Sequence, residues 1–202
     1  MIGVFTAPTG SRTVDGFEKR FGVNYVGHWA LTVLLMPTLL RSSTPDFNSR
    51  VIAVASSSHR FSPIRWDDLN LEETDDLWIA YGQSKTGVIW MANYIDRIFG
   101  PRGVHATAVH PGMIWTGILS DMGPEMTHGM QSNKPLMKIM QTPEQGAATT
   151  IWAALSPEWE GKGGKYLHAC SIGEQAKDAM SILDPSYAPH ALTRRAKNGY
   201  GR

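Results

Sequence analysis

Two buried-strand patterns separated by a long helical pattern constrain the fold of this chain most strongly. Residues 50–55 read Arg-Val-Ile-Ala-Val-Ala, and residues 104–109 read Val-His-Ala-Thr-Ala-Val. Short, nearly continuous apolar runs are typical of strands that are covered on both faces of a parallel sheet. Between them, residues 77–99 form a helical pattern with one apolar stripe of Ile89, Ala92, Ile95 and Phe99. The strand–helix–strand order predicts a right-handed crossover between parallel strands.

Further elements extend this alternation on both sides. They are a short strand at residues 2–5, a helix from an N-cap at Asp15 to about Leu40, a helix at residues 143–155 and a short strand at residues 165–169. The alternation predicts an α/β fold with a doubly wound parallel sheet, the Rossmann-like arrangement. Ligands bind beyond the carboxyl ends of the strands in such sheets, so a site is expected where the two buried strands end.

Composition excludes several classes of protein. The chain has 202 residues, which suits one domain, and 42% of them are apolar, as in a globular protein. A formal net charge of +1 gives no reason to expect nucleic acid as a partner. Cys170 is the only cysteine, so no disulfide can form within the chain. The apolar stretch from His28 to Leu40 is too short to span a bilayer, so we expect no transmembrane segment and a cytoplasmic location.

Tyr81 and Lys85 form a Tyr-x-x-x-Lys pair. Four residues apart on a helix, they share one face. A free phenol has a pKa of about 10, and a nearby ammonium lowers it, so the pair can move a proton to or from a carbonyl oxygen. Alone the motif is weak, because an exposed aromatic–lysine pair on a helix looks the same. Its position on a helix that follows a buried strand ending in serines favours a catalytic role.

Other residues extend or narrow this hypothesis. Ser57, just after the strand, is placed to hydrogen-bond the same substrate oxygen, and Asn24 to hold a water or its helix backbone in a proton relay from Lys85. Asp67 and Asp68 suit loop capping better than metal binding, so no metal is expected. A serine hydrolase is disfavoured, because Ser57 lacks the Gly-x-Ser-x-Gly pattern.

Several short motifs follow one another in a specific order. They are Asp15-Gly16-Phe17-Glu18, Phe21-Gly22-Val23-Asn24, Gly27-His28-Trp29, the run from Arg50 to Phe61, Asp67-Asp68-Leu69-Asn70, Ala80-Tyr81-Gly82-Gln83-Ser84-Lys85, the run from His110 to Thr116, and Gln145-Gly146-Ala147. From the first residue to about His168, this order resembles the short-chain dehydrogenase/reductase family, especially its retinol dehydrogenase and WW-domain oxidoreductase branch.

The resemblance implies a catalytic tetrad of Asn24, Ser57, Tyr81 and Lys85. Among the three adjacent serines it favours Ser57, while Ser56 and Ser58 are expected to be structural. Tyr81 is then the acid–base, and Lys85 also binds the nicotinamide ribose.

The resemblance also implies a cofactor and partners. Ile114 and Thr116 are expected to contact the nicotinamide end of NADP, with NAD as the other candidate, and the family implies a homodimer formed through the two long helices. Six of the ten methionines lie between Met113 and Met140, where the family has its substrate lid. Flexible thioethers suit an adaptable apolar pocket, although ordinary amphipathic packing gives the same composition. We expect a small lipophilic substrate and a role in secondary metabolism.

The family normally opens with a strand, a glycine-rich turn and a helix that bind the cofactor pyrophosphate. No such turn stands in this chain, so the resemblance implies an N-terminally truncated fold, with a partial dehydrogenase domain at residues 1–183 and a basic, poorly ordered tail at residues 184–202. Three explanations stay open: a mis-assigned start codon, a degenerate relative that binds partners, or a second subunit that supplies the missing surface.

The leading expectation is an NADP(H)-dependent oxidoreductase that interconverts a lipophilic ketone or aldehyde and its alcohol. The alternative is a catalytically inert remnant that acts as a binding or regulatory protein.

Overall fold

A four-stranded sheet organises the structure, a computed structural model that describes residues 3–8, 10–119, 122–177, 184 and 186–192. The strand order is β1 (Ser49–Val54), β2 (Val104–His110), β5 (Tyr166–His168) and β6 (Ser171–Ile172). The β1–β2 and β2–β5 pairs are parallel, whereas β5 and β6 form an antiparallel hairpin. A separate two-stranded parallel sheet joins β3 (Met113–Ile114) to β4 (Met140–Gln141). The predicted parallel α/β sheet is confirmed, with one antiparallel edge added to it.

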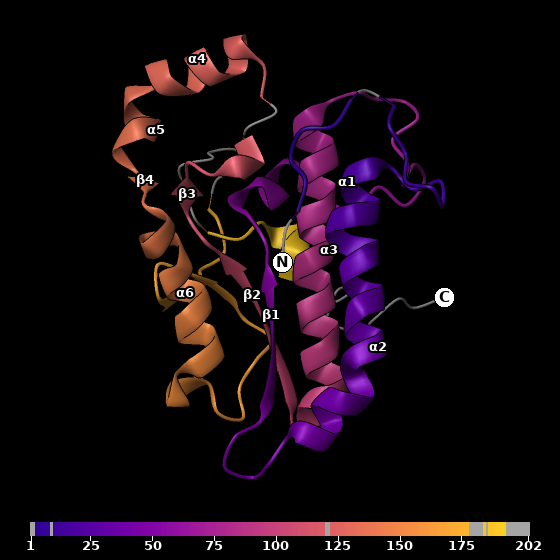
Figure 1. Cartoon of the computed structure of the whole chain (residues 1–202), viewed down its shortest axis with the longest axis vertical. Coiled ribbons are helices and arrows are strands. Elements are labelled where there is room, and N and C mark those ends of the chain that lie inside the picture. Colours follow the sequence, from indigo (N-terminus) through magenta and orange to yellow (C-terminus); the bar gives the residue numbers. More distant parts are fainter. Residues whose placement is uncertain (1–2, 9, 120–121, 178–183, 185, 193–202) are drawn as a thin grey trace.

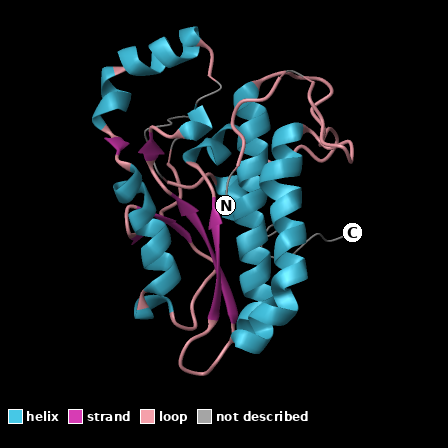
Figure 2. Cartoon of the chain, viewed as in Figure 1, coloured by secondary structure: helices cyan, strands magenta, loops and turns pink. Residues whose placement is uncertain are grey.

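Helices cover both faces of this sheet (Figures 1 and 2). The helix α3 (Leu77–Phe99) and the continuous stretch α1 (Lys19–Phe21), a π-helical turn (Gly22–Val26) and α2 (Gly27–Ser42) lie on one side, and α6 (Pro143–Leu155) lies on the other. The short helices α4 (Pro124–Ser132) and α5 (Lys134–Lys138) lie at the end of the molecule where β3 and β4 pair. Short 3-10 turns span Ser57–Phe61, Gly100–Arg102, Gly117–Leu119, Pro157–Trp159 and Pro189–Leu192. The doubly wound arrangement predicted from the alternation is therefore present.

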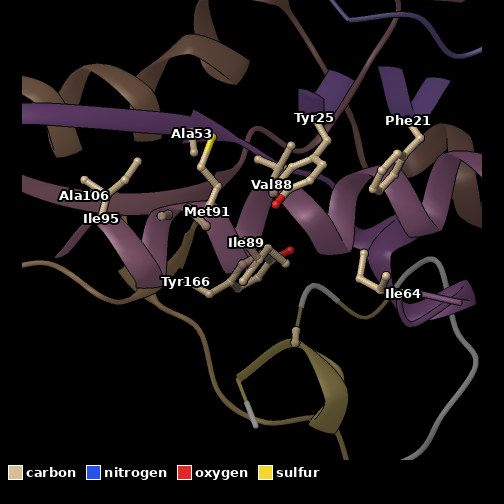
Figure 3. Packing of buried hydrophobic residues seen from close by; sticks show 14 of the residues in the cluster. Phe21, Tyr25, Ala53, Ile64, Val88, Ile89, Met91, Ile95, Ala106 and Tyr166 are labelled. Atoms are coloured by element: carbon tan, nitrogen blue, oxygen red, sulfur yellow. The ribbon is translucent and has the colours of Figure 1, made fainter. Parts of the chain in front are cut away.

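The core lies between α3 and the strands. Figure 3 shows Met91 and Ile95 of α3 pointing toward Ala53 of β1 and Ala106 of β2. Ile89 and Ile95 are completely buried, and each buried side chain of this size stabilises the fold by about 1.5–3 kcal/mol. Small alanines on the strands let the helix approach closely, so the position of α3 relative to the sheet is fixed by packing.

The predicted strand at residues 2–5 is wrong for residues 3–5, which form no strand and end in a bend at Phe5. Instead the side chain of Asn24 satisfies both backbone groups of Val4. Its Oδ1 accepts from the Val4 N–H at 2.7 Å, and its Nδ2 donates to the Val4 carbonyl at 2.8 Å. The strand β1 is thereby left at the edge of the sheet. The first helix also begins later than predicted, at Lys19 rather than after Asp15, because Gly16 adopts a φ of 85° in a turn.

The predicted tail does not begin at residue 184. Residues 186–192, which we name the C-terminal segment, pack onto the domain, with Ala188 and Ala191 buried and Tyr187 bridged to Gln175. A 3-10 turn spans Pro189–Leu192. The boundary drawn at residue 183 therefore falls inside the folded unit, while the rest of the predicted tail, residues 193–202, lies outside the described residues.

The helical stretch Lys19–Ser42 extends beyond the apolar run from His28 to Leu40 on which the expectation of no transmembrane segment rested. It has 24 residues, and by length and composition it could cross a membrane, although core helices of soluble proteins satisfy the same criterion. Here Phe21, Tyr25 and Met36 reach the core, while Leu31, Leu34 and Leu35 are exposed. One face of the stretch is therefore committed to the domain, and the other is an apolar surface.

Candidate active site

A cavity of about 490 Å³ opens along β1 and its carboxyl end, where the doubly wound fold places ligands. Its wall is mostly apolar. The wall is formed by β1 and two of the serines that follow it, His28 of α2, α3, the loop from Pro111 to Leu119, Met130 of α4, and Gly3 and Phe5 of residues 3–8, which we name the N-terminal segment. The polar groups that interrupt this wall are few, as in most small-molecule sites.

Tyr81 and Lys85 both line this cavity from α3, one turn apart as their spacing predicts. Gly82 lets this turn of the helix approach the 3-10 turn Ser57–Phe61, which we name the serine turn. A Cβ at this position would lie 2.7 Å from the Ser58 carbonyl oxygen. The Lys85 Nζ lies 5.4 Å from the centre of the Tyr81 ring and donates to the Val54 carbonyl at 3.0 Å. Both side chains are buried, with 8% of Tyr81 and 5% of Lys85 exposed.

Burial sets the protonation of this pair. It raises the pKa of Tyr81 to about 12, and a hydrogen bond with Ser56 opposes that rise. It lowers the pKa of Lys85 to about 8. The expectation that the lysine lowers the pKa of the phenol is therefore not met, because loss of water raises that pKa by more than the hydrogen bond with Ser56 lowers it. Tyr81 holds its proton throughout the neutral range.

Ser56, rather than the predicted Ser57, accompanies Tyr81. Ser56 lines the cavity, interacts with the phenol through its hydroxyl and accepts from the Ser58 N–H at 3.1 Å. Ser57 is 1% exposed and does not line the cavity, and its Oγ has no partner among the described residues. Its N–H instead donates to Nδ1 of His110 at 3.3 Å. The chain turns into a 3-10 helix at Ser57, which rotates the second serine inward, and three adjacent serines give no sequence signal for that turn.

Asn24 is fully buried and does not line the cavity. Besides holding Val4, the Asn24 Nδ2 donates to Ser84 Oγ at 3.1 Å. The backbone carbonyl of Asn24 accepts from Nδ1 of His28 at 2.7 Å. Gly3 must be glycine here, because a Cβ would meet the Asn24 Oδ1 at 2.8 Å. The structure therefore does not bring Asn24 together with Tyr81 and Lys85 as a cavity-lining group. It places Asn24 as the clamp of the N-terminal segment.

Sequence reasoning missed a second clamp and the residue that it positions. Arg20 donates from Nε to the Phe5 carbonyl at 2.7 Å and from Nη2 to the Ala7 carbonyl at 3.0 Å, and Glu18 pairs with it at 2.9 Å. The Phe5 ring is thereby held edge-on to Tyr81, with the ring centres 4.8 Å apart. An arginine in a polar stretch of sequence is normally expected at the surface. Only the structure, in which 9% of Arg20 is exposed, reveals this role.

Ile114 and Thr116 line the cavity, as expected of residues near a bound nicotinamide. Gly112 begins this loop with a φ of 94°, and β3 fixes Ile114 opposite Gln141. The methionine-rich region covers the same end of the cavity, because Met122, Met126 and Met130 pack with Phe5 and Tyr81. The pocket thus joins the predicted proton-transfer pair, the loop predicted to hold the cofactor and the predicted lid.

We expect the Lys85→Met substitution to stabilise the fold at neutral pH. A pKa lowered from 10.5 to about 8 corresponds to about 3 kcal/mol of destabilisation, and loss of the hydrogen bond to Val54 returns about 1 kcal/mol. The folded state binds fewer protons than the unfolded state between pH 8 and 10.5, so wild-type stability rises with pH across that window. Urea denaturation should show the variant about 1–2 kcal/mol more stable at pH 7, with the gap closing by pH 10. Lys162→Met, at an exposed lysine, is the control. The prediction is contradicted if the difference in free energy of unfolding between Lys85→Met and the wild type is the same at pH 7 and pH 10.

Comparison with known proteins gives a consistent result. A family model described as enoyl-(acyl carrier protein) reductase matches residues 2–169. The short-chain dehydrogenase/reductase prx1 of Penicillium rubens is 44% identical over 182 residues, which cover 90% of this chain and 53% of that protein. Human polyprenol dehydrogenase is 37% identical, covering 82% and 50%, and human retinol dehydrogenase 14 is 36% identical, covering 88% and 52%. The chain spans about half the length of these relatives.

Solved structures agree on the fold. A complex of Pseudomonas aeruginosa RhlG with NADP superimposes with a TM-score of 0.61 at 20% identity, covering 83% of this chain and 61% of that one. A Mycobacterium paratuberculosis short-chain dehydrogenase bound to NAD gives 0.58 at 21% identity, covering 83% and 59%. The family model, the curated relatives and the Rossmann-like sheet together show that the chain belongs to the short-chain dehydrogenase/reductase family, in a branch that resembles the retinol dehydrogenases.

Proposed function

We propose that the protein is an NADP(H)-dependent oxidoreductase that interconverts a lipophilic ketone or aldehyde and its alcohol. The observation that carries the proposal is the pair of hydroxyls, Ser56 and Tyr81, in the wall of an otherwise apolar cavity with Lys85 buried beside them. The nicotinamide supplies or accepts the hydride at the substrate carbon when it is bound. Tyr81 donates its proton to the substrate oxygen, and Ser56 holds that oxygen in place.

The residues present fit the nicotinamide riboside end of such a cofactor. An ammonium has three donors, and Val54 is the only hydrogen-bond acceptor for Lys85 among the described residues, so N–H groups remain for the ribose hydroxyls. Ile114 and Thr116 line the same cavity. In the part of the chain that the structure describes, no glycine-rich turn leads into a helix beside β1 to receive the pyrophosphate. Neighbours of the same fold carry NADP in one case and NAD in another, and the proposal takes NADP.

Three observations support a lipophilic substrate. Phe5, Trp78 and Met130 form aromatic and thioether parts of the cavity wall. Among the described residues that line the cavity, the only lysine, arginine or carboxylate is Lys85, which the cofactor ribose engages in this proposal. Two relatives are named for polyprenol and retinol, both long apolar alcohols. We include a role in secondary metabolism in this proposal.

A second candidate is a catalytically inert protein that binds a partner. Two observations favour it: one edge of β1 pairs with no other strand among the described residues, and the Phe5 ring lies against Tyr81. An inert protein needs no ionisable pair in its cavity, whereas the oxidoreductase does. Removing the Tyr81 hydroxyl therefore separates the two candidates.

We expect the protein to oxidise NADPH in the presence of a hydrophobic ketone or aldehyde such as decanal, and much less with pyruvate. Tyr81→Phe keeps the ring packed on Phe5 but removes the proton donor, so kcat should fall about 10²–10⁴-fold. Absorbance at 340 nm follows the reaction, and the melting temperature of the variant serves as the control for folding. If the wild type oxidises no NADPH and the Tyr81→Phe variant has the same melting temperature and the same lack of activity, the inert candidate is supported.

The two neighbouring serines should respond differently. Ser56→Ala removes the hydroxyl that faces Tyr81 and should lower kcat about 10²-fold or more. Ser57→Ala removes a buried hydroxyl without a described partner, so activity should stay within about twofold and the free energy of unfolding should be unchanged or higher. Steady-state kinetics and urea denaturation of the matched pair test this assignment. A larger loss of kcat in Ser57→Ala restores the original choice of Ser57.

We propose a homodimer, which the family implies through both long helices, and we place its contact on the exposed face of α2 because most of α3 is buried. Leu34 is 77% exposed and lies beside the exposed Leu31 and Leu35 on this face. Light scattering should give twice the 22.3 kDa of one chain, and Leu34→Glu should reduce it to a single chain. Leu155→Glu on α6, where the leucine is 66% exposed, is the matched control and should leave the dimer intact. A monomeric wild type contradicts the proposal.

A further inference from the structure

His59 is completely buried, directly follows the three serines, and has partners for both of its ring nitrogens. Its Nε2 accepts from the Ala188 N–H at 3.0 Å. A backbone N–H can only donate, so Nε2 carries no proton, and Nδ1 must carry it and donate to the Ser56 carbonyl at 2.6 Å. Burial lowers the pKa of His59 to about 3, so this neutral tautomer persists through the neutral range.

One end of this ring fixes the residue that faces Tyr81. The carbonyl of Ser56 accepts from His59, while the hydroxyl of Ser56 accepts from the Ser58 N–H and reaches the phenol. Ser56 is thus held at its backbone by His59 and at its side chain by Ser58. His59 itself does not line the cavity, so it can act on a substrate only through Ser56.

The other end of the ring holds the C-terminal segment. His190 returns from that segment to donate from Nε2 to the His59 carbonyl at 2.9 Å, and the His190 carbonyl accepts from Trp90 Nε1 of α3 at 3.1 Å. Beside them Arg60 pairs with Asp184 at 2.8 Å. The C-terminal segment is therefore tied to the serine turn at several points, and His59 connects it directly to Ser56.

We propose that His59 is a positioning residue that sets the orientation of Ser56 at Tyr81 and makes it depend on the docked C-terminal segment. This inference rests on the proposed oxidoreductase function for its catalytic consequence. Its structural content is that one rigid ring carries two separable hydrogen bonds, one toward the site and one toward residue 188. If His59 only stabilised the fold, loss of either hydrogen bond would have the same effect on Ser56.

Two variants separate these bonds. In His59→Asn the amide nitrogen is the same number of bonds from Cβ as Nδ1, so the bond to Ser56 can be kept while the bond to Ala188 is lost. In His59→Gln the amide oxygen takes the place of Nε2, so the bond to Ala188 can be kept while the bond to Ser56 is lost. Both variants lose one buried hydrogen bond and should lower the melting temperature by similar amounts.

Amide hydrogen exchange measured by NMR on the whole chain reads the outcome without any need for turnover. The Ser58 N–H reports on the position of the Ser56 hydroxyl, and the Ala188 N–H reports on the C-terminal segment. His59→Gln should speed exchange at Ser58 more than at Ala188, and His59→Asn should show the reverse. Equal acceleration of both amides in both variants, or none, overturns the proposal.

Kinetics then test the catalytic consequence. His59→Gln should lower kcat about tenfold or more with little change in KM, while His59→Asn should lose less than about threefold. The hydrogen bond from Ser56 lowers the pKa of Tyr81. Its loss in His59→Gln should shift the rise of the alcohol-oxidation rate with pH to higher pH, and His59→Asn should show no such shift. Equal losses of kcat in the two variants overturn the positioning role. A wild type that does not turn over counts against the proposed function, and the exchange pattern alone then decides the inference about His59.

Discussion

The burial of α3 is the constraint on which the rest of the structure depends. From Ala80 to Ile95 almost every side chain of this helix is buried, and it packs against β1, β2, the serine turn, α1 and the 3-10 turn of the C-terminal segment. Interiors of this kind are close-packed, so none of these elements can shift without moving the others. Tyr81 and Lys85 inherit their geometry from this packing. The same helix that holds the core together therefore also holds the proton-transfer pair.

Burial also determines the resting state of the site. Removing water raises the pKa of Tyr81 to about 12 and lowers that of Lys85 to about 8, so at pH 7 the phenol keeps its proton and Lys85 is still mainly an ammonium. A protonated phenol is ready to give its proton to a carbonyl oxygen, which suits reduction. Oxidation of an alcohol needs the opposite state, and a positive charge beside the phenol would favour it. The direction of proton transfer is thus linked to what occupies the cavity.

The elements that the sequence predicted well are those whose pattern is set locally or by burial on both faces. The strand predicted at Arg50–Ala55 is found at Ser49–Val54, and the helices at residues 77–99 and 143–155 have the predicted bounds. These helices carry N-caps, Asp76 and Thr142, that fix where they begin. Tyr81, Lys85, Ile114 and Thr116 follow from that frame, because strand ends and helix faces bring them to one cavity.

The parts that were not predicted depend on contacts between distant residues. Residues 3–5 form no strand, and the Asn24 side chain, 20 positions away, bonds to the backbone of Val4 instead. The C-terminal segment is ordered by His59 and Arg60, more than 120 positions away. The choice between Ser56 and Ser57 turns on the backbone rotation at the start of one 3-10 turn. No periodicity or local propensity records such features.

The hydrogen bonds of Asn24 bear on how this chain can change over evolutionary time. Its amide gives one acceptor and two donors to Val4 and Ser84, a combination that aspartate lacks and that glutamine, longer by one methylene, would misplace. Selection for folding alone is enough to preserve it. Lys85 is the reverse case, since a buried ammonium weakens the fold and drift toward an apolar side chain would relieve that cost. In a lineage of such chains, a retained asparagine therefore records architecture, and a retained lysine records selection for chemistry.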